Sequence, residues 1–566
     1  MSPAERPPLT FTVDGLPVDV PDAGESLLDV LRERLGLRSP KDGCSPQGQC
    51  GCCTVLVDGQ PRVACVTPAR RVRGRTITTL DGLDEHERDR WGDAFCTAGA
   101  SQCGFCTPGI VVRLAGLRAK GAGPDDEAAV EQALLAHLCR CTGWRTILDA
   151  WRFATGDGEA LAPGQAPAGE AGQAPTARDL DRAARRAGIE GRTPQRVGPG
   201  VALGRGGFAD DRAPREALVA VPDGRGGWAT GETLAEARTA AGKVQGRRTT
   251  AELRHPLEVP PGVWDLTLRT TWVEPAYLEV DASWCLPGGE PASPLANGGA
   301  FGGKLDSVVT GAARELADRH GRPVRVVLAR EDAVRLGAKR PPMAAGVRAD
   351  GTGVIRVVCT PGIAEAIDAV TPGVTVEEVE VPGPPTSAAI RAAGWAEALV
   401  LSAGVTSLGA TGRDRGEVGT VTPGVRRATT VGSGAEASVT LTSPDGATAD
   451  ATVRLGDDPR VSVRVACGEP LDEIALRSYC VGAAHMGLAW VCSEGLAVDE
   501  SGEVHDLTIR SFGVLRAIDM PPVEVEIAPE DGTPVNGSDA VFAAVAAAAW
   551  LAQGTPPAWP TGTLPR

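Results

Sequence analysis

The sequence predicts a chain of several domains with an α+β fold. The chain has 566 residues, which is more than a single hydrophobic core usually organises. Its apolar pattern changes along the chain, from strand-like alternation at the start to helical periodicity up to about residue 153 and a mixture beyond residue 178. A hydrophobic content of 42% and a charged content of 23% are those of an ordinary globular protein.

The first module is expected at residues 1–82. Apolar and polar residues alternate in LTFTVDGLPVDV and in CTVLVDGQPRVAC, and each stretch is centred on an Asp-Gly pair. Asp-Gly between two alternating runs predicts a β-hairpin. An amphipathic helix, LLDVLRERLG, lies between the hairpins, and a short strand, RTITTL, follows them. Strand, strand, helix, loop, strand, strand is the order of a β-grasp fold of the ferredoxin type.

The next segments differ in character. Residues 83–155 contain three stretches of helical periodicity and predict a small helical bundle. Residues 156–178 are rich in Gly, Ala and Pro and predict a flexible linker. Residues 179–566 mix strand patterns, such as RPVRVVLA and VSVRVACG, with helical ones, such as SVVTGAARELADRHG and SDAVFAAVAAAAWLAQG. An α+β domain is expected there.

Eight cysteines form two groups of four. The first group is Cys44, Cys50, Cys53 and Cys65. A Cys cluster with a C-x2-C pair and a distant fourth Cys is typical of a [2Fe–2S] site. The spacing from Cys44 to Cys50 is one residue longer than the usual plant-type spacing, and Cys52 stands beside Cys53. We choose Cys53 as the ligand because it restores C-x2-C after Cys50. Tetrahedral zinc is the competing interpretation.

The second group is Cys103, Cys106, Cys139 and Cys141. The first two precede a helix that begins near Pro108, and the last two are expected to end another helix. Two facing helix ends could hold four sulfurs around a second [2Fe–2S] cluster. The five cysteines beyond residue 141 stand alone and are expected to be buried apolar residues: Cys285, Cys359, Cys467, Cys480 and Cys492.

Residues 9–155 resemble the iron–sulfur subunit of the molybdenum hydroxylases, the xanthine dehydrogenase, aldehyde oxidase and carbon monoxide dehydrogenase family. The resemblance lies in QGQCGCCTVLVDG, GASQCGFCTPGIV and LLAHLCRCTGWRTILDA. It implies a β-grasp domain with an outer cluster and a helical domain with an inner one. The inner cluster would take electrons from molybdopterin, and the outer would pass them to FAD. Gln102 would lie beside the pterin; alternatively, it makes a hydrogen bond at the helix start.

The C-terminal half resembles a truncated molybdenum subunit of the same family. NGGAFGGK, residues 297–304, is similar to the turn that cradles the cofactor, which suggests Gly298, Gly299, Phe301 and Gly302 as cofactor-binding residues. The same stretch spells the G-x4-G-K of a P-loop, but Leu305 stands where a P-loop has Ser or Thr. A simple glycine-rich connection is the third interpretation.

Several family motifs are absent from the C-terminal half. Residues 179–566 contain no G-Q-G-x-x-T motif and no G-x-G-E motif, the second of which carries the catalytic base of the family. The nearest acids, Glu530, Asp531 and Asp539, are out of frame. No catalytic residue is therefore expected on this chain, and molybdopterin is expected on another subunit.

Charge and composition exclude some classes of function. A net charge of −15 argues against general nucleic-acid binding. The N-terminus lacks a secretory pattern, and the longest apolar run, 541–552, is too short to span a bilayer. We therefore expect a cytoplasmic protein with no membrane partner.

The sequence supports one main hypothesis and two rivals. The main one is an electron-transfer subunit with two [2Fe–2S] clusters, which works with a molybdopterin-binding large subunit and an FAD-binding subunit. The first rival is a self-sufficient hydroxylase of aldehydes or purines that binds molybdopterin at the glycine turn. The second is an assembly scaffold whose clusters only stabilise the fold.

Overall fold

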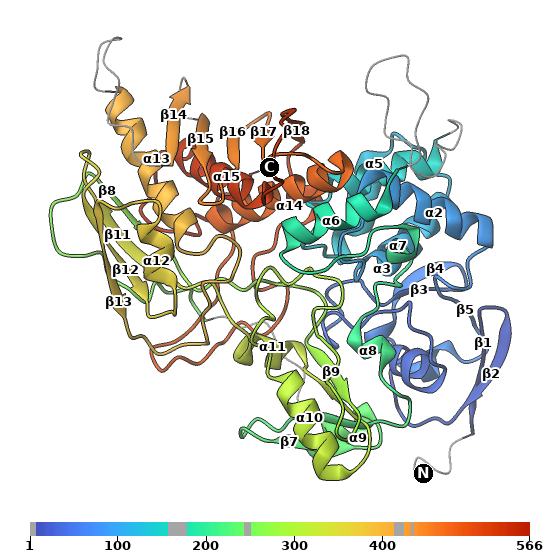
Figure 1. Ribbon diagram of the computed structural model, residues 1–566. Coiled ribbons are helices and arrows are strands. Elements are labelled where there is room, and N and C mark those ends of the chain that lie inside the picture. Colours follow the sequence, from blue (N-terminus) through green and yellow to red (C-terminus); the bar gives the residue numbers. More distant parts are fainter. Residues whose placement is uncertain (1–6, 157–177, 243–250, 412–423, 432–434, 566) are drawn as a thin grey trace.

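The computed structural model describes residues 7–156, 178–242, 251–411, 424–431 and 435–565. Almost all of the expected linker lies outside these ranges. The described part contains a five-stranded sheet, a group of helices and three further sheets, so the α+β prediction is confirmed. Figure 1 shows the N-terminal sheet and helices on the right, and the three later sheets at the bottom, left and top.

The N-terminal sheet has the strand order β2-β1-β5-β3-β4. The two predicted hairpins form β1–β2 and β3–β4, and in both turns Asp and Gly have positive φ: 51° and 83° at Asp14 and Gly15, 48° and 73° at Asp58 and Gly59. Both residues of a type I′ turn require this conformation, which explains the Asp-Gly pairs. The elements are β1 (Leu9–Val13), β2 (Leu16–Val20), α1 (Leu27–Asp29), η2 (Val30–Arg34), β3 (Thr54–Val57), β4 (Gln60–Val63), η3 (Ala64–Val66), η4 (Ala69–Val72) and β5 (Thr76–Thr78).

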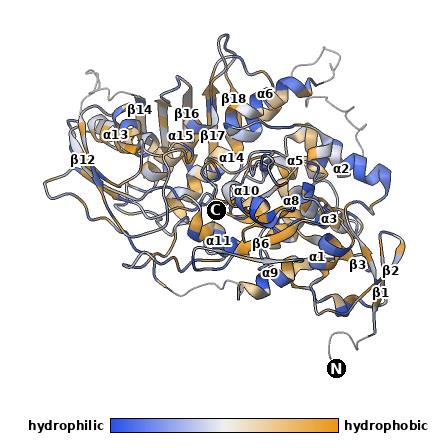
Figure 2. Cartoon of the chain, turned by 60° about the horizontal axis from the view of Figure 1, so that its bottom comes forward, coloured by the Kyte–Doolittle hydropathy of each residue, from blue (hydrophilic) through white to orange (hydrophobic). Residues whose placement is uncertain are grey.

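The helical module packs against this sheet. Helix α2 begins at Asp84, whose carboxylate accepts from the backbone N–H groups of His86 and Glu87. Its hydrophilic residues face outward, and α2 is largely blue in Figure 2, in contrast to the orange strand β6. The elements are α2 (Glu85–Ala98), α3 (Thr107–Arg118), α4 (Glu127–Ala133), η5 (Leu134–Ala136) and α5 (Arg145–Thr155).

Two four-stranded sheets follow in the second half. One has the order β7-β6-β10-β9 and the other the order β13-β12-β11-β8. Helix α10 covers the first of them, where Val309, Ala313 and Leu316 belong to the apolar cluster over β9 and β10. The elements are α6 (Leu180–Gly191), α7 (Pro199–Ala202), α8 (Ala209–Arg212), β6 (Leu218–Pro222), β7 (Trp228–Gly231), α9 (Leu234–Ala240), β8 (Leu266–Arg269), β9 (Ala282–Cys285), α10 (Val309–His320), β10 (Val324–Val327), α11 (Arg330–Leu336), β11 (Met343–Val347), β12 (Gly353–Val358), α12 (Ile363–Asp368) and β13 (Val374–Val379).

The last sheet, β14-β15-β16-β17-β18, is covered by helices α14 and α15. Helix α15 is buried along its whole length, which explains its apolar sequence. None of the helices in the described ranges combines the length and the apolar character needed to cross a membrane. The elements are α13 (Trp395–Thr411), β14 (Val425–Val431), β15 (Glu436–Thr442), β16 (Thr448–Arg454), β17 (Arg460–Ala466), α14 (Glu473–Cys492), η6 (Ala517–Asp519), β18 (Val523–Ile527) and α15 (Ser538–Ala552).

Two sequence-based expectations were wrong. Cys139 and Cys141 do not end a helix: η5 ends at Ala136, and both cysteines lie in the loop before α5. The helix stops early because the backbone turns to extended geometry at His137, with φ −109° and ψ 156°. Cys359 is exposed, because it directly follows β12 at the surface, whereas the other four solitary cysteines are buried as expected.

Candidate iron–sulfur centres

The first cysteine quartet gathers at one end of the N-terminal sheet. Cys44 and Cys50 lie in the loop before β3, Cys53 lies directly at the start of that strand, and Cys65 lies in η3. All four are buried. The thiols of Cys50 and Cys65 donate hydrogen bonds to Cys44, and these bonds hold the pKa of Cys44 well below its usual value. The same contacts raise the pKa values of Cys50 and Cys65, so the thiols of this quartet share protons with one another.

The two adjacent cysteines of this loop point in different directions. Cys53 Sγ accepts from the Cys65 backbone N–H at 3.4 Å, and the thiol of Cys65 also contacts Cys53. Cys52 instead directs its thiol to the Cys50 carbonyl at 3.9 Å. A backbone N–H, that of Gln47, donates to Cys44 Sγ at 3.2 Å. Hydrogen bonds of this kind tune the potential of an iron–sulfur centre.

The second quartet is divided into two pairs. Cys103 and Cys141 form one pair, with their Sγ atoms 3.6 Å apart. Cys106 and Cys139 form the other: the Cys106 thiol donates to Cys139 and, as the largest influence, lowers the pKa of Cys139 to about 7. The Thr142 hydroxyl lies 3.1 Å from Cys139 Sγ. The segment just before helix α3 supplies the first cysteine of each pair, and the loop before α5 supplies the second.

The pairing in the second quartet suits a two-iron centre better than a single ion; in the first quartet Cys44 contacts both Cys50 and Cys65. In a [2Fe–2S] site each iron takes two of the four thiolates, whereas zinc takes all four at one centre. Across the described ranges, no group of three or more His, Cys, Asp or Glu side chains is placed to hold a single metal ion. The donor sets of both quartets fit a [2Fe–2S] cluster.

A short backbone connection joins the two quartets. The Leu138 N–H donates to the Cys50 carbonyl at 3.0 Å, and Cys139 is the next residue in the chain. Helix α3 also approaches this loop closely: a side chain at Gly109 would meet the Gly51 carbonyl. One hydrogen bond therefore connects a cysteine of the first quartet to the neighbour of one in the second. No sequence pattern marked Leu138 for this position.

The glycine turn, residues 297–304, lies directly over the Cys103–Cys141 pair. A Cβ added at Gly299 would lie 2.8 Å from Cys103 Cβ and 3.0 Å from Cys103 Sγ. The Asn297 carboxamide donates to the Cys103 carbonyl at 3.0 Å and so fixes the turn there. The positive φ of Gly299, 78°, together with this contact explains why glycine is required. The sequence motif predicted the turn, but it did not identify Asn297 as the residue that holds the turn in place.

The other residues expected near a pterin are engaged with protein groups. Gln102 donates from its side-chain amide to the Cys141 carbonyl at 2.9 Å and to the Ser478 hydroxyl at 3.0 Å. Lys304 is buried and bonds to Glu279 at 2.9 Å. A side chain at Gly302 would meet the Ala389 carbonyl. The structure therefore brings Gln102 and the turn together at the second quartet.

The cavity beside the turn is small. It has a volume of about 100 Å³ and is lined by Phe301, Gly302, Arg391 and Asp539, among others. Pockets for small ligands usually measure about 300–1,000 Å³. Asp539 is paired with Arg391 at 2.9 Å and with Arg192 at 2.7 Å, while Glu530 and Asp531 are exposed. The residues present do not fit a molybdopterin.

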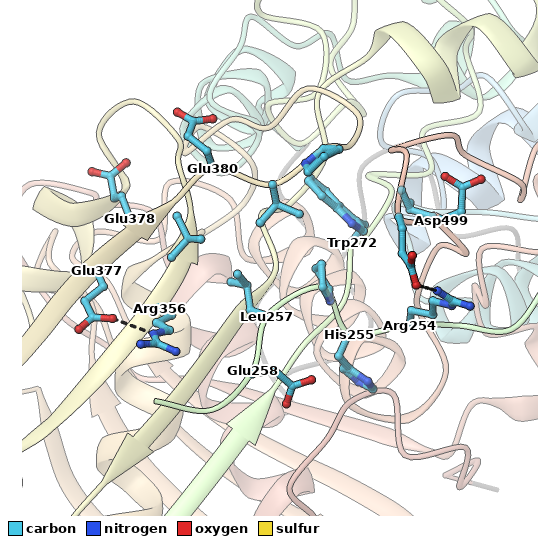
Figure 3. A pocket seen from close by; sticks show the side chains of 16 residues that line it. Arg254, His255, Leu257, Glu258, Trp272, Arg356, Glu377, Glu378, Glu380 and Asp499 are labelled. Carbon is cyan, nitrogen blue, oxygen red and sulfur yellow. Dashed lines mark hydrogen bonds and ion pairs between the residues drawn. The ribbon is translucent and has the colours of Figure 1, made fainter. Parts of the chain in front are cut away.

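A larger cavity among the described residues lies elsewhere. It measures about 730 Å³ and includes none of the cysteines in its lining. Figure 3 shows its acidic side chains, of which Glu377 is paired with Arg356 at 2.7 Å. Arg254 is paired with Glu500 at 2.7 Å, and Asp499 bonds to His505 at 2.8 Å. Because these charges are engaged with neighbouring groups, the iron–sulfur loops remain the better candidate site.

Known proteins match the iron–sulfur part. A family model described as a 2Fe-2S iron-sulfur cluster binding domain matches residues 11–74, and one described as a [2Fe-2S] binding domain matches residues 79–152. The nicotinate dehydrogenase small FeS subunit of Eubacterium barkeri is 42% identical over 136 residues, which are 24% of this chain and 85% of that protein. A probable xanthine dehydrogenase subunit of Bacillus subtilis is 37% identical over 147 residues, which are 26% of this chain and 84% of that protein.

The whole chain matches a larger protein in fold. Its structure aligns with that of the aldehyde oxidoreductase from Desulfovibrio gigas with a TM-score of 0.67 at 14% identity, over 97% of this chain and 98% of the other. At this identity the likeness concerns the fold. The two [2Fe–2S]-binding domains at the start of the chain are similar in sequence to small iron–sulfur subunits of dehydrogenases. The rest of the chain follows the fold of the aldehyde oxidoreductase. The chain therefore belongs to the molybdenum hydroxylase family, as an oxidoreductase component whose C-terminal part shares the fold of the aldehyde oxidoreductase.

Proposed function

We propose that the chain is the electron-transfer subunit of a molybdenum hydroxylase complex. In this proposal Cys44, Cys50, Cys53 and Cys65 hold an outer [2Fe–2S] cluster, and Cys103, Cys106, Cys139 and Cys141 hold an inner one. Electrons arrive from molybdopterin on a large partner subunit and leave toward FAD on another. The names of the relatives, which are themselves subunits of dehydrogenases, support partner subunits of this kind.

The observation that carries the proposal is the connection between the quartets. A bound [2Fe–2S] cluster takes up and releases one electron at a time. The residues of the chain keep the two sites at a fixed separation, because the Leu138 N–H holds the Cys50 carbonyl at 3.0 Å. Helix α3, packed on Gly51, prevents the two modules from moving apart. Seven of the eight cysteines are buried, and Cys103 is partly exposed.

The C-terminal part has a different role in this proposal. Its glycine turn closes the Cys103–Cys141 edge of the inner site and leaves a cavity of about 100 Å³. We infer that this part holds no molybdopterin and instead covers the inner cluster. The domain boundaries expected from sequence, near residues 82, 155 and 178, belong to the same proposal.

Metal analysis tests the proposal directly. The full chain, purified alone and reconstituted anaerobically, is expected to contain about four irons and four acid-labile sulfides, two of each per cluster. It should contain no molybdenum. Electron paramagnetic resonance after dithionite reduction should show two distinct signals. A zinc-loaded or colourless protein would contradict the proposal, and clusters that cannot be reduced would favour the scaffold.

One observation favours a second function, a self-sufficient hydroxylase. The structural match to the aldehyde oxidoreductase covers 97% of this chain. That function would require stoichiometric molybdenum in the purified chain, and oxidation of an aldehyde with an artificial electron acceptor in the absence of a partner. The small cavity beside the glycine turn argues against it.

A further inference from the structure

The C-terminal part covers one side of the first cysteine loop. Arg330 donates to the Gly43 carbonyl at 2.6 Å. The side-chain amide of Gln47 donates to the Leu507 carbonyl at 2.8 Å, and its oxygen accepts from the Ile509 N–H at 3.2 Å. These contacts bury the side of the loop that faces α11 and residues 507–509. An electron acceptor has to approach this loop from another direction.

The loop is open to solvent at Val66. This residue follows Cys65 directly, and its methyl groups lie over Gly48, between Cys44 and Cys50. Val66 is 52% exposed, so only one side chain separates this part of the ligand loop from solvent. An exposed apolar residue surrounded by charges is typical of the centre of a protein interface.

Arginines are concentrated in the sequence on both sides of Val66. Residues 58–80 contain five arginines and one acidic residue, although the whole chain has a net charge of −15. Arg62, Arg70 and Arg71 are exposed, and none of them has an ion-pair partner among the described residues. Arg62 lies three residues before Cys65, and Arg70 and Arg71 lie in η4, the next turn after η3.

A further arginine approaches the same loop from the C-terminal part. Arg510 donates from Nε to the Gln49 carbonyl at 2.9 Å and from its second amino group to the Leu135 carbonyl at 2.6 Å. It is exposed. We call Arg62, Val66, Arg70, Arg71 and Arg510 the basic edge. The nearby acid Glu25 is already paired with Arg34 at 2.6 Å.

We propose that the basic edge is the docking surface for an acidic face of the protein that accepts electrons from the first cluster. The inference rests on the proposed electron-transfer function and adds where the acceptor binds and what charge its surface carries. Complementary charge accelerates encounter and orients the two proteins. Val66 then supplies the apolar contact nearest to the cysteine ligands. Each transferred electron oxidises one reduced cluster and reduces one acceptor centre, with no bond made or broken.

Binding of an acidic polypeptide tests the surface separately from the chemistry. Fluorescently labelled poly-L-glutamate is titrated into the full reconstituted chain, and anisotropy is measured at low salt and at about 0.5 M salt. The test variant is Arg70→Glu/Arg71→Glu. The matched control is Arg426→Glu/Arg427→Glu, because these are also two adjacent exposed arginines, on β14. Affinity should fall about tenfold in the test variant and stay unchanged in the control.

Electron transfer provides the second readout. The dithionite-reduced chain is mixed with ferricyanide, an anionic one-electron acceptor, and cluster reoxidation is followed by stopped flow. The wild-type rate should fall when unlabelled poly-L-glutamate covers the basic edge. The rate of Arg70→Glu/Arg71→Glu should be about tenfold lower without the competitor and insensitive to it. Arg70→Gln/Arg71→Gln should lie between the two.

The outcomes separate the two proposals. The test variant Arg70→Glu/Arg71→Glu is compared with the control Arg426→Glu/Arg427→Glu. If the two lose affinity and rate equally, or if neither does, the basic edge is not the docking surface, and the electron-transfer function stands. If the wild-type chain cannot be reduced at all, the proposed function itself fails, while poly-L-glutamate binding still tests the surface.

Discussion

Two adjacent residues in the first ligand loop, Cys52 and Cys53, have different environments. Cys53 is hydrogen-bonded to the backbone of Cys65, whereas the thiol of Cys52 faces the Cys50 carbonyl. We predict that Cys53→Ser removes the outer cluster and lowers the iron content from about four to about two per chain. Cys52→Ser should keep both clusters. Iron analysis and paramagnetic resonance check this, and loss of iron in Cys52→Ser alone would reverse the assignment.

Gly299 has no room for a side chain on the side of the second quartet. Gly299→Ala would place a methyl group 2.8 Å from Cys103 Cβ, so it should broaden or shift the signal of the inner cluster while leaving the outer signal unchanged. Gly288→Ala is the matched control, because Gly288 has a similar positive φ of 67° but nothing within 4 Å. If both variants alter the inner signal equally, backbone strain is the cause and not the contact.

At the scale of elements, α3 and α10 provide a matched pair of glycines. Gly109 and Gly311 are each the third residue of their helix. Gly311→Ala adds a methyl group in open space and should stabilise the protein by about 0.5–1 kcal/mol. Gly109→Ala would collide with the Gly51 carbonyl and should destabilise it by about 1–3 kcal/mol. Urea unfolding measures both, and stabilisation by Gly109→Ala would show that α3 does not press on the cysteine loop.

Helix α14 contains a buried histidine that makes stability depend on pH. Burial, with a smaller contribution from Arg140, lowers the pKa of His485 to about 4 from 6.5. Between pH 6.5 and about pH 4, His485 therefore binds a proton in the unfolded chain but not in the folded one. The free energy of unfolding therefore has its full value, as far as His485 is concerned, above pH 6.5 and decreases as the pH falls toward 4. Between pH 7 and pH 5 the loss should be about 2 kcal/mol. Urea unfolding of His485→Gln should show a smaller pH slope, and an unchanged slope would contradict the assignment.

Local sequence signals predicted most elements but not the loop of Cys139 and Cys141. Asp-Gly hairpins and the α2, α10 and α15 helices follow from short-range patterns, and the structure confirms them. The end of α4 does not follow from a short-range pattern, because the sequence EAAVEQALLAHLC keeps its helical periodicity through Cys139. The Leu138 N–H instead bonds to the Cys50 carbonyl, a tertiary contact that overrides the local preference. Propensity is a weak predictor wherever such a contact exists.

At the scale of the whole molecule, a buried ion pair joins the iron–sulfur part to the C-terminal part. Arg140 and Glu494 are 3% and 2% exposed, and a second hydrogen bond between them measures 2.8 Å. Glu494→Ala would leave a buried unpaired arginine and should cost about 3–5 kcal/mol. Glu500→Ala breaks an exposed pair with Arg254 and should cost about 1 kcal/mol or less. Urea unfolding of both variants checks this, and equal losses would show that burial does not decide the cost.

The candidate site was predictable only in part. The eight cysteines and the glycine turn stand out in the sequence because ligand spacing and glycine clusters are local. The contact between Gly299 and Cys103 joins residues that are almost 200 positions apart, and nothing local encodes it. The same holds for the basic edge, where Arg510 joins arginines from residues 62–71.

The glycine turn covers Cys103 and Cys141 with a single layer of backbone. A Cβ added at Gly299 would lie 2.8 Å from Cys103 Cβ, so a larger side chain has no room between the turn and the cysteine. An external donor centre that approaches from this side is therefore held at least one backbone layer away, a thickness of roughly 5 Å. Because Gly299 has no side chain, the layer of protein between the inner site and an approaching donor centre is as thin as a polypeptide allows.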